Sequence, residues 1–212
     1  MSSVNEIKQH LKAVEQTRQI TNAMYLLSTS RMKKAMQHID FNLLYLKRLR
    51  ATIKDILSKT KNNNLTNRFI EDNGLGTAVF VVVTSDKGLC GGYNSAVVKL
   101  AEEEMAKYPK PMVISLGLAG DRMFREKGVK PEYSWYGASQ HPTMNLASQV
   151  ANKLIELYLT NDYHEVYVVY TEFVSSAVQE PRCVRLLPLL RRDFLDVERE
   201  GDKNAQMIFE PS

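Results

Sequence analysis

The first 73 residues contain neither glycine nor proline, the two residues that most readily interrupt a helix. Their absence argues against a series of short elements joined by tight turns. Apolar side chains recur there at alternating steps of three and four residues, which is the period of a coiled-coil seam. We therefore predict one helix from about Val4 to Thr60, about 85 Å long at 1.5 Å per residue. The seam consists of Val4, Ile7, Leu11, Val14, Met32, Ile39, Leu46, Leu49, Ile53 and Ile56.

Polar residues suited to a helix start and to a helix end lie at the two ends of this segment. Ser3 and Glu6 have the spacing of a capping box, in which each side chain bonds a backbone amide near the helix start. Lys59 suits the partial negative charge at the carboxyl end of a helix. An apolar seam of this length is not stable alone in water, so the helix needs a partner helix.

Cysteines and long apolar runs are also scarce. The two cysteines, Cys90 and Cys183, are too few for a disulfide framework and lack metal-ligand spacing. No run approaches the roughly 18 apolar residues of a membrane span, and the first residues resemble neither a signal peptide nor a transit peptide. We expect a cytoplasmic protein with reduced thiols, no metal, no cofactor and no redox switch.

Charge is divided unevenly along the chain. Residues 1–61 hold twelve Lys and Arg against four Asp and Glu, a balance of +8, whereas the remainder holds sixteen against twenty, a balance of −4. A basic helix favours an acidic protein surface, a nucleic acid or an anionic lipid surface as its partner. A solvated helix face is the simpler alternative.

After residue 76 the pattern changes to short apolar runs that alternate with helical ones. The run at 77–84 is apolar on both faces, as a buried parallel strand requires. We predict further strands at 112–116, 166–173 and 183–187, and helices at 94–107, 118–127 and 143–159. This alternation indicates a mostly parallel sheet covered on both faces. The predicted fold class is α/β: a long coiled-coil helix over 1–61, a linker over 62–76 and a Rossmann-like domain over 77–212.

A glycine-rich loop, TSDKGLCGGYNS at 84–95, follows the first predicted strand. Ligands often bind at this edge of an α/β sheet, but the loop matches neither the P-loop nor the dinucleotide pattern. Cys90 beside Lys87 has the setting of an activated thiol, yet no histidine motif supplies a base. The glycines favour close approach to another surface. A thiol or nucleotide enzyme is kept as an alternative.

Nucleic-acid binding is a further alternative, because basic residues cluster at 31–34 and 47–54. A basic helix can lie along phosphates without reading sequence. However, DNA-reading basic regions usually precede a zipper rather than run through it, and the domain offers no aromatic stacking platform. We therefore expect no nucleic-acid partner.

Several segments, in order along the chain, resemble the γ subunit of F-type ATP synthases. They are VNEIK at 4–8, QITNAM at 19–24, RMKKA at 31–35, the glycine-rich loop, YTEFVS at 170–175, LLPL at 186–189 and IFEPS at 208–212. The resemblance spans essentially the whole chain.

The resemblance implies a central rotor stalk that makes no catalytic bond itself. In that family the long helix turns inside a ring of α and β subunits and couples proton or sodium flow to ATP synthesis or hydrolysis. The α/β domain lies against an ε-type subunit and the membrane c-ring, at the cytoplasmic face of what we expect to be a bacterial plasma membrane, with no segment inserted. The implied contacts with the α/β ring are Arg31, Lys33, Lys34, Lys87, Gly88, Cys90 and Gly91.

In that family the γ subunit continues past the FEP motif into a second long helix that returns along the first. Nothing after residue 76 has the length or period of such a helix. Two expectations stay open: the chain is a fragment, or it is a short relative whose seam is covered by another subunit or by a second copy. A self-associating coiled-coil protein of the same fold, without a rotary role, is the alternative function.

Overall fold

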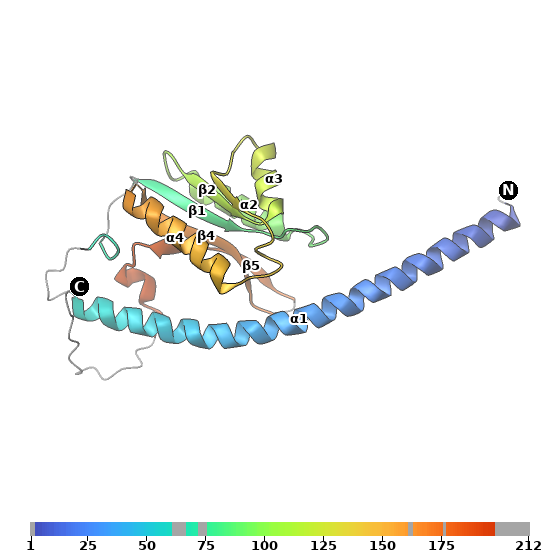
Figure 1. Cartoon of the computed structure of the whole chain (residues 1–212), viewed down its shortest axis with the longest axis horizontal. Coiled ribbons are helices and arrows are strands. Elements are labelled where there is room, and N and C mark those ends of the chain that lie inside the picture. Colours follow the sequence, from blue (N-terminus) through green and yellow to red (C-terminus); the bar gives the residue numbers. More distant parts are fainter. Residues whose placement is uncertain (1–2, 61–66, 72–75, 161–162, 176, 198–212) are drawn as a thin grey trace. The chain divides into compact units, whose positions relative to one another are not determined.

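The computed structural model describes residues 3–60, 67–71, 76–160, 163–175 and 177–197. The elements in order are α1 (Val4–Thr60), β1 (Thr77–Val83), α2 (Tyr93–Met105), β2 (Met112–Leu116), α3 (Leu118–Glu126), β3 (Tyr133–Trp135), α4 (Met144–Thr160), β4 (Tyr163–Phe173), β5 (Gln179–Leu187) and a 3₁₀ helix, η1 (Arg191–Phe194) (Figure 1).

The chain forms two compact units. The helical unit comprises Met1–Ile56 and Val197–Ser212, and the sheet unit comprises Leu57–Asp196. The sequence-based boundaries after residues 61 and 76 stay a prediction. Most of the predicted linker and the IFEPS segment lie outside the described residues.

Helix α1 begins at the predicted capping box. The Ser3 amide donates to Glu6 Oε2 at 2.8 Å, and the Glu6 amide donates to Ser3 Oγ at 3.4 Å. The helix then runs for 57 residues, from Val4 to Thr60, which confirms the predicted helix. Its length follows from the absence of glycine and proline, because no residue breaks the ladder of backbone hydrogen bonds.

The apolar seam of α1 is largely solvent-exposed in this chain. Its exposed members are Val4, Ile7, Leu11, Val14, Met32, Leu46, Leu49 and Ile56. The other two, Ile39 and Ile53, are half-buried. An exposed apolar stripe of this length is typical of a helix that packs against another.

No helix in the described ranges combines the length and the apolar character that crossing a bilayer requires.

The sheet unit contains five strands in the order β3-β2-β1-β4-β5. The first four run parallel and β5 pairs antiparallel with β4. The order β3-β2-β1-β4 is that of the first part of a Rossmann sheet, so the predicted Rossmann-like fold is confirmed. Strand β5 lies at an edge, where Pro181 is tolerated.

Strand β1 separates two hydrophobic cores. Ala78, Phe80 and Val82 pack into the core beneath α2 and α3. Val79 and Val81 point to the opposite face, into the core beneath α4. Each of these five side chains is at most 1% exposed. Figure 1 shows α4 lying across one face of the sheet with α2 and α3 on the other, as the unbroken apolar run predicted.

Part of the predicted linker packs against the sheet unit. The Phe69 ring lies 5.5 Å from that of Tyr158, and the Arg68 guanidinium lies 5.1 Å above the same tyrosine ring. Arg68 also donates to the Tyr163 carbonyl at 3.0 Å, and the Tyr158 hydroxyl donates to the Arg68 carbonyl at 2.7 Å. Arg68 and Phe69 are therefore fixed against α4 and the start of β4.

A buried polar network joins β4 and β5 to η1. The carboxylate of Glu165, which is 7% exposed, accepts hydrogen bonds from Tyr108 at 2.6 Å, Tyr167 at 3.0 Å and Arg185 at 3.1 Å. Arg185 also pairs with Asp193 at 2.6 Å. Burial, followed by the hydrogen bond to Glu165, raises the pKa of Tyr108, so its hydroxyl stays a donor at neutral pH. One arginine thus pairs with two carboxylates, and the tyrosine hydroxyls supply further donors to Glu165.

Replacing Arg185 by methionine should destabilise the sheet unit by about 3–5 kcal/mol, because Glu165 loses its buried cation. Arg182→Met is the matched control: Arg182 lies on the same strand, and its half-exposed side chain pairs with Glu172 and Glu180. A surface pair of this kind contributes up to about 1 kcal/mol. Urea unfolding measures both variants, and equal losses would contradict the role assigned to Arg185.

Candidate functional site

The glycine-rich loop leaves the carboxyl end of β1 and is anchored at once to the neighbouring loop. The Thr84 amide donates to the Leu116 carbonyl at 2.7 Å, and the Thr84 hydroxyl accepts from the Gly120 amide at 2.9 Å. A Cβ on Gly117, whose φ is +114°, would lie 2.3 Å from the Thr84 carbonyl oxygen, and one on Gly120 would lie 2.7 Å from the Thr84 hydroxyl. Only glycine permits this approach at either position.

Asp86 ties three loops of this sheet edge together. Its Oδ1 accepts from the amides of Leu118 at 3.1 Å and Gly137 at 2.9 Å. Its Oδ2 accepts from the hydroxyl of Ser139 at 2.6 Å and from the amide of the same residue at 3.3 Å. Partial burial raises the pKa of Asp86, but these hydrogen bonds outweigh it and hold the pKa below its ordinary value. The carboxylate is therefore ionised at neutral pH and turned inward.

Asn94 closes the loop from its other end. Its Oδ1 accepts from the Ser85 amide at 2.9 Å, and its Nδ2 donates to the Ser85 hydroxyl at 2.8 Å. The same Nδ2 lies 3.1 Å from Cys90 Sγ. The Ser85 hydroxyl also donates to the Lys87 carbonyl at 2.7 Å. Loop residues 85–94 are thus cross-linked internally, and the Cys90 thiol takes part in that cross-linking.

The second cysteine has a different setting. Cys183 lies on β5 and packs against the core beneath α2 and α3. Burial raises its pKa to about 12, so the thiol stays protonated and behaves as a small apolar side chain. Within the described ranges, no three His, Cys, Asp or Glu side chains gather as a metal-binding group.

The tip of the loop projects into solvent. Lys87, Gly88, Leu89 and Gly91 are exposed, whereas Cys90 is half-buried. Leu89 is 94% exposed and adopts a φ of +65°, and Gly91 has a φ of +57°. The structure therefore presents a cation and an apolar side chain at the end of an anchored loop.

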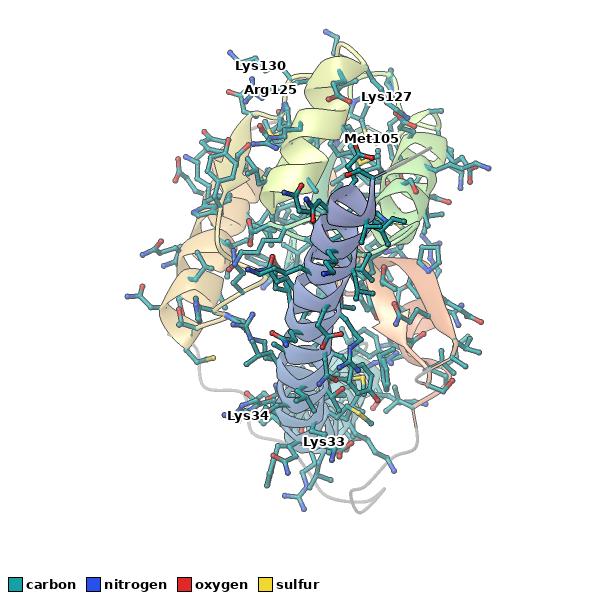
Figure 2. All side chains as sticks on the ribbon, turned by 90° about the vertical axis from the view of Figure 1, so that its right-hand side faces the viewer. Lys33, Lys34, Met105, Arg125, Lys127 and Lys130 are labelled. Atoms are coloured by element: carbon teal, nitrogen blue, oxygen red, sulfur yellow. The ribbon has the colours of Figure 1, made fainter. Side chains whose placement is uncertain are left out.

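The predicted contact residues form two groups. Lys87, Gly88, Cys90 and Gly91 lie together in the loop of the sheet unit. Arg31, Lys33 and Lys34 lie within about one turn of α1, all exposed, and Figure 2 shows Lys33 and Lys34 leaving the helix on different sides. Consecutive residues are about 100° apart around a helix, so the three cations do not form one stripe. Their contact role stays a prediction.

Sequence reasoning did not single out Asp86, Leu89 or Asn94. The signal for Asp86 and Asn94 was present, since both types bond nearby backbone amides in loops at strand ends. Which amides they bond depends on residues as far away as Gly137 and Ser139, which follow β3. No local pattern marked Leu89, because leucine has no preference for a positive φ.

The helical unit carries an exposed apolar seam and exposed basic side chains, and the sheet unit presents an anchored loop with an exposed tip. Features of this kind are typical of a subunit that contacts other proteins. A family model described as ATP synthase matches residues 3–212. The chain is 32% identical to the ATP synthase gamma chain of Alkaliphilus metalliredigens over 210 residues, covering 99% of this chain and 72% of that one. It is 35% identical over 220 residues to the ATP synthase gamma chain of Caldanaerobacter subterraneus, covering 98% and 73%. The chain therefore belongs to the ATP synthase gamma chain family.

A solved structure shares the fold. The central stalk and c-ring structure of the Tetrahymena thermophila mitochondrial ATP synthase contains a chain that matches with a TM-score of 0.52 at 18% identity. The match covers 83% of this chain and 80% of that one. The fold of this chain is therefore also found in a chain of that structure.

Replacing Asp86 by alanine should destabilise the sheet unit by about 1–3 kcal/mol at pH 7, because the partly buried amides of Leu118 and Gly137 lose their acceptor. The depressed pKa of Asp86 sets the pH dependence. Its contribution is complete above the unfolded pKa of about 4 and is lost as pH falls through the folded value. The difference between wild type and Asp86→Ala in urea unfolding should therefore be largest at pH 7 and shrink as pH falls below about 4. A difference in unfolding free energy that stays undiminished in acid would contradict the role assigned to the Asp86 carboxylate. The control is Glu103→Ala, which removes a carboxylate from an exposed face of α2.

Proposed function

We propose that this chain acts as the rotor stalk of its complex: by rotating, it couples ion flow through the membrane ring to ATP synthesis or hydrolysis in the α/β ring. The observation that carries the proposal is the 57-residue α1, in a chain of the gamma family, with its apolar seam open to a partner helix. The chain itself breaks and forms no bond. Its task is to present different surfaces to otherwise equivalent catalytic sites.

Asymmetry is the physical basis of such coupling. One rod inside a ring of three equivalent sites contacts each site differently, and a ligand or contact shifts a conformational equilibrium only through differential binding. Each orientation of the rod therefore favours a different state at each site. Rotation then moves the sites through these states in turn.

The basic side chains supply the contacts with the ring in this proposal. Residues 1–61 carry a balance of +8, and Arg31, Lys33 and Lys34 are exposed. Lys87 adds a cation at the loop tip. We propose that these cations, with Gly88, Cys90 and Gly91, face an acidic segment of the β subunits. Complementary charge of this kind sets orientation and association rate more than affinity.

The seam and the sheet unit supply the remaining contacts. The seam residues, from Val4 to Ile56, pack against a second helix within the assembly. The sheet unit faces the ε-type subunit and the membrane c-ring from the cytoplasmic side, without entering the bilayer, and binds no nucleic acid. These assignments follow from family membership and from the exposed apolar side chains of α1.

The double variant Lys33→Glu/Lys34→Glu tests the basic contacts. Mixed with purified α and β subunits, wild-type chain should co-purify with the ring and raise its ATP turnover. The variant should bind about tenfold more weakly at low salt, and the difference should shrink in about 0.5 M salt, because exposed charges are screened. Lys110→Glu/Lys130→Glu is the matched control, with the same change in net charge placed on exposed residues of the sheet unit (Lys130 in Figure 2). A wild-type chain that neither binds the ring nor changes its turnover would refute the rotor role.

A further inference from the structure

Leu89 combines two features that are rarely found together. In the part of the chain that the structure describes, it is the one residue other than glycine with a positive φ. It is also 94% exposed, more than any other large apolar side chain there. Residues with a Cβ avoid the left-handed region, and a branched apolar side chain in water gains nothing from its own fold in return. Strain of this kind at an exposed position points to a use outside the chain.

The anchors on either side of the tip hold this conformation. Asp86 is fixed by four hydrogen bonds from the two neighbouring loops. Asn94 binds Ser85 through both ends of its amide. Between these anchors, a Cβ built on Gly88 or Gly91 meets no atom within 4 Å. The tip therefore stands clear of its own chain while its base is rigid.

Charge at the tip is of one sign. The Asp86 carboxylate is directed inward and its acceptors are occupied by amides and a hydroxyl. Lys87 is exposed and belongs to no ion pair among the described residues. The surface that fits this tip is an apolar socket with carboxylates at its rim. A rigid base favours a protein socket over a lipid surface, because preorganisation lowers the entropy lost on binding a partner of fixed shape.

We propose that Leu89 is the anchor of this loop: its side chain inserts into an apolar socket on the α/β ring, and Lys87 pairs with carboxylates at the rim. The proposal rests on the rotor function and identifies which side chain of the loop makes the central contact. A buried leucine surrounded by a polar rim is the arrangement in which one side chain dominates an interface. The neighbouring glycines then serve to let the partner approach.

Leu89→Asn tests the anchor, because asparagine tolerates a positive φ but carries no apolar surface. It should weaken binding to the ring of α and β subunits by about 10- to 100-fold, the loss expected when one leucine is no longer buried. The thermal unfolding midpoint of the free chain should be unchanged or higher, since strain is relieved. Leu89→Met keeps the apolar contact and should bind within a few-fold of wild type. The matched control is Met144→Asn, which makes the same kind of change at another exposed apolar residue: Met144 is 83% exposed at the start of α4.

The possible outcomes separate this proposal from the rotor function. If wild type binds the ring and Leu89→Asn binds equally well, the anchor is refuted and the rotor function stands. If wild type does not bind at all, the rotor function itself fails. A lower unfolding midpoint in Leu89→Asn would make Leu89 a structural residue and overturn the proposal. So would unchanged ring binding combined with lost binding to vesicles containing anionic phospholipid, which would place Leu89 against a membrane surface.

Discussion

The complete burial of β1 is the constraint on which the sheet unit depends. Ala78 to Val82 have almost no exposed surface, so helices must cover both faces of the strand. That requirement leads to crossover connections and parallel neighbours, and parallel strands end at the same edge of a sheet. The loops after β1, β2 and β3 therefore meet at one edge. Asp86 can bridge all three only because the core has already placed them side by side.

Elements with a strong hydrophobic period could be located from the sequence. Helix α1 has the predicted ends, and β2 covers the predicted residues 112–116. Strand β3 could not be found, because three half-buried residues carry no period. Strand β5 begins at Gln179, before the predicted residue 183, since its first residues are exposed and owe their conformation to pairing with β4. Where a strand exists because of its neighbour, its own sequence is a weak guide.

In the candidate site too, some features could be predicted from the sequence and others could not. The position of the loop, and its content of glycine and lysine, were readable from the chain. Its internal order was not, because the partners of Asp86 lie 32 to 53 residues further along. Nor was the φ of Leu89, which results from anchors on both sides and not from the preference of leucine. The cations at 31–34 of α1 are a third case: their basic cluster was readable from the chain, whereas the surface that they contact stays a prediction.

The polar network around Arg185 has a mechanical consequence. Arg191 of η1 donates to the carbonyl of Leu57, in the last turns of α1. The same short helix carries Asp193, which Arg185 connects to Glu165 in the sheet. Leu57 is therefore connected to β4 through a hydrogen bond from Arg191 and, by way of η1, through the ion pairs of Arg185 with Asp193 and Glu165. These directional contacts resist displacement of the last turn of α1 against the sheet.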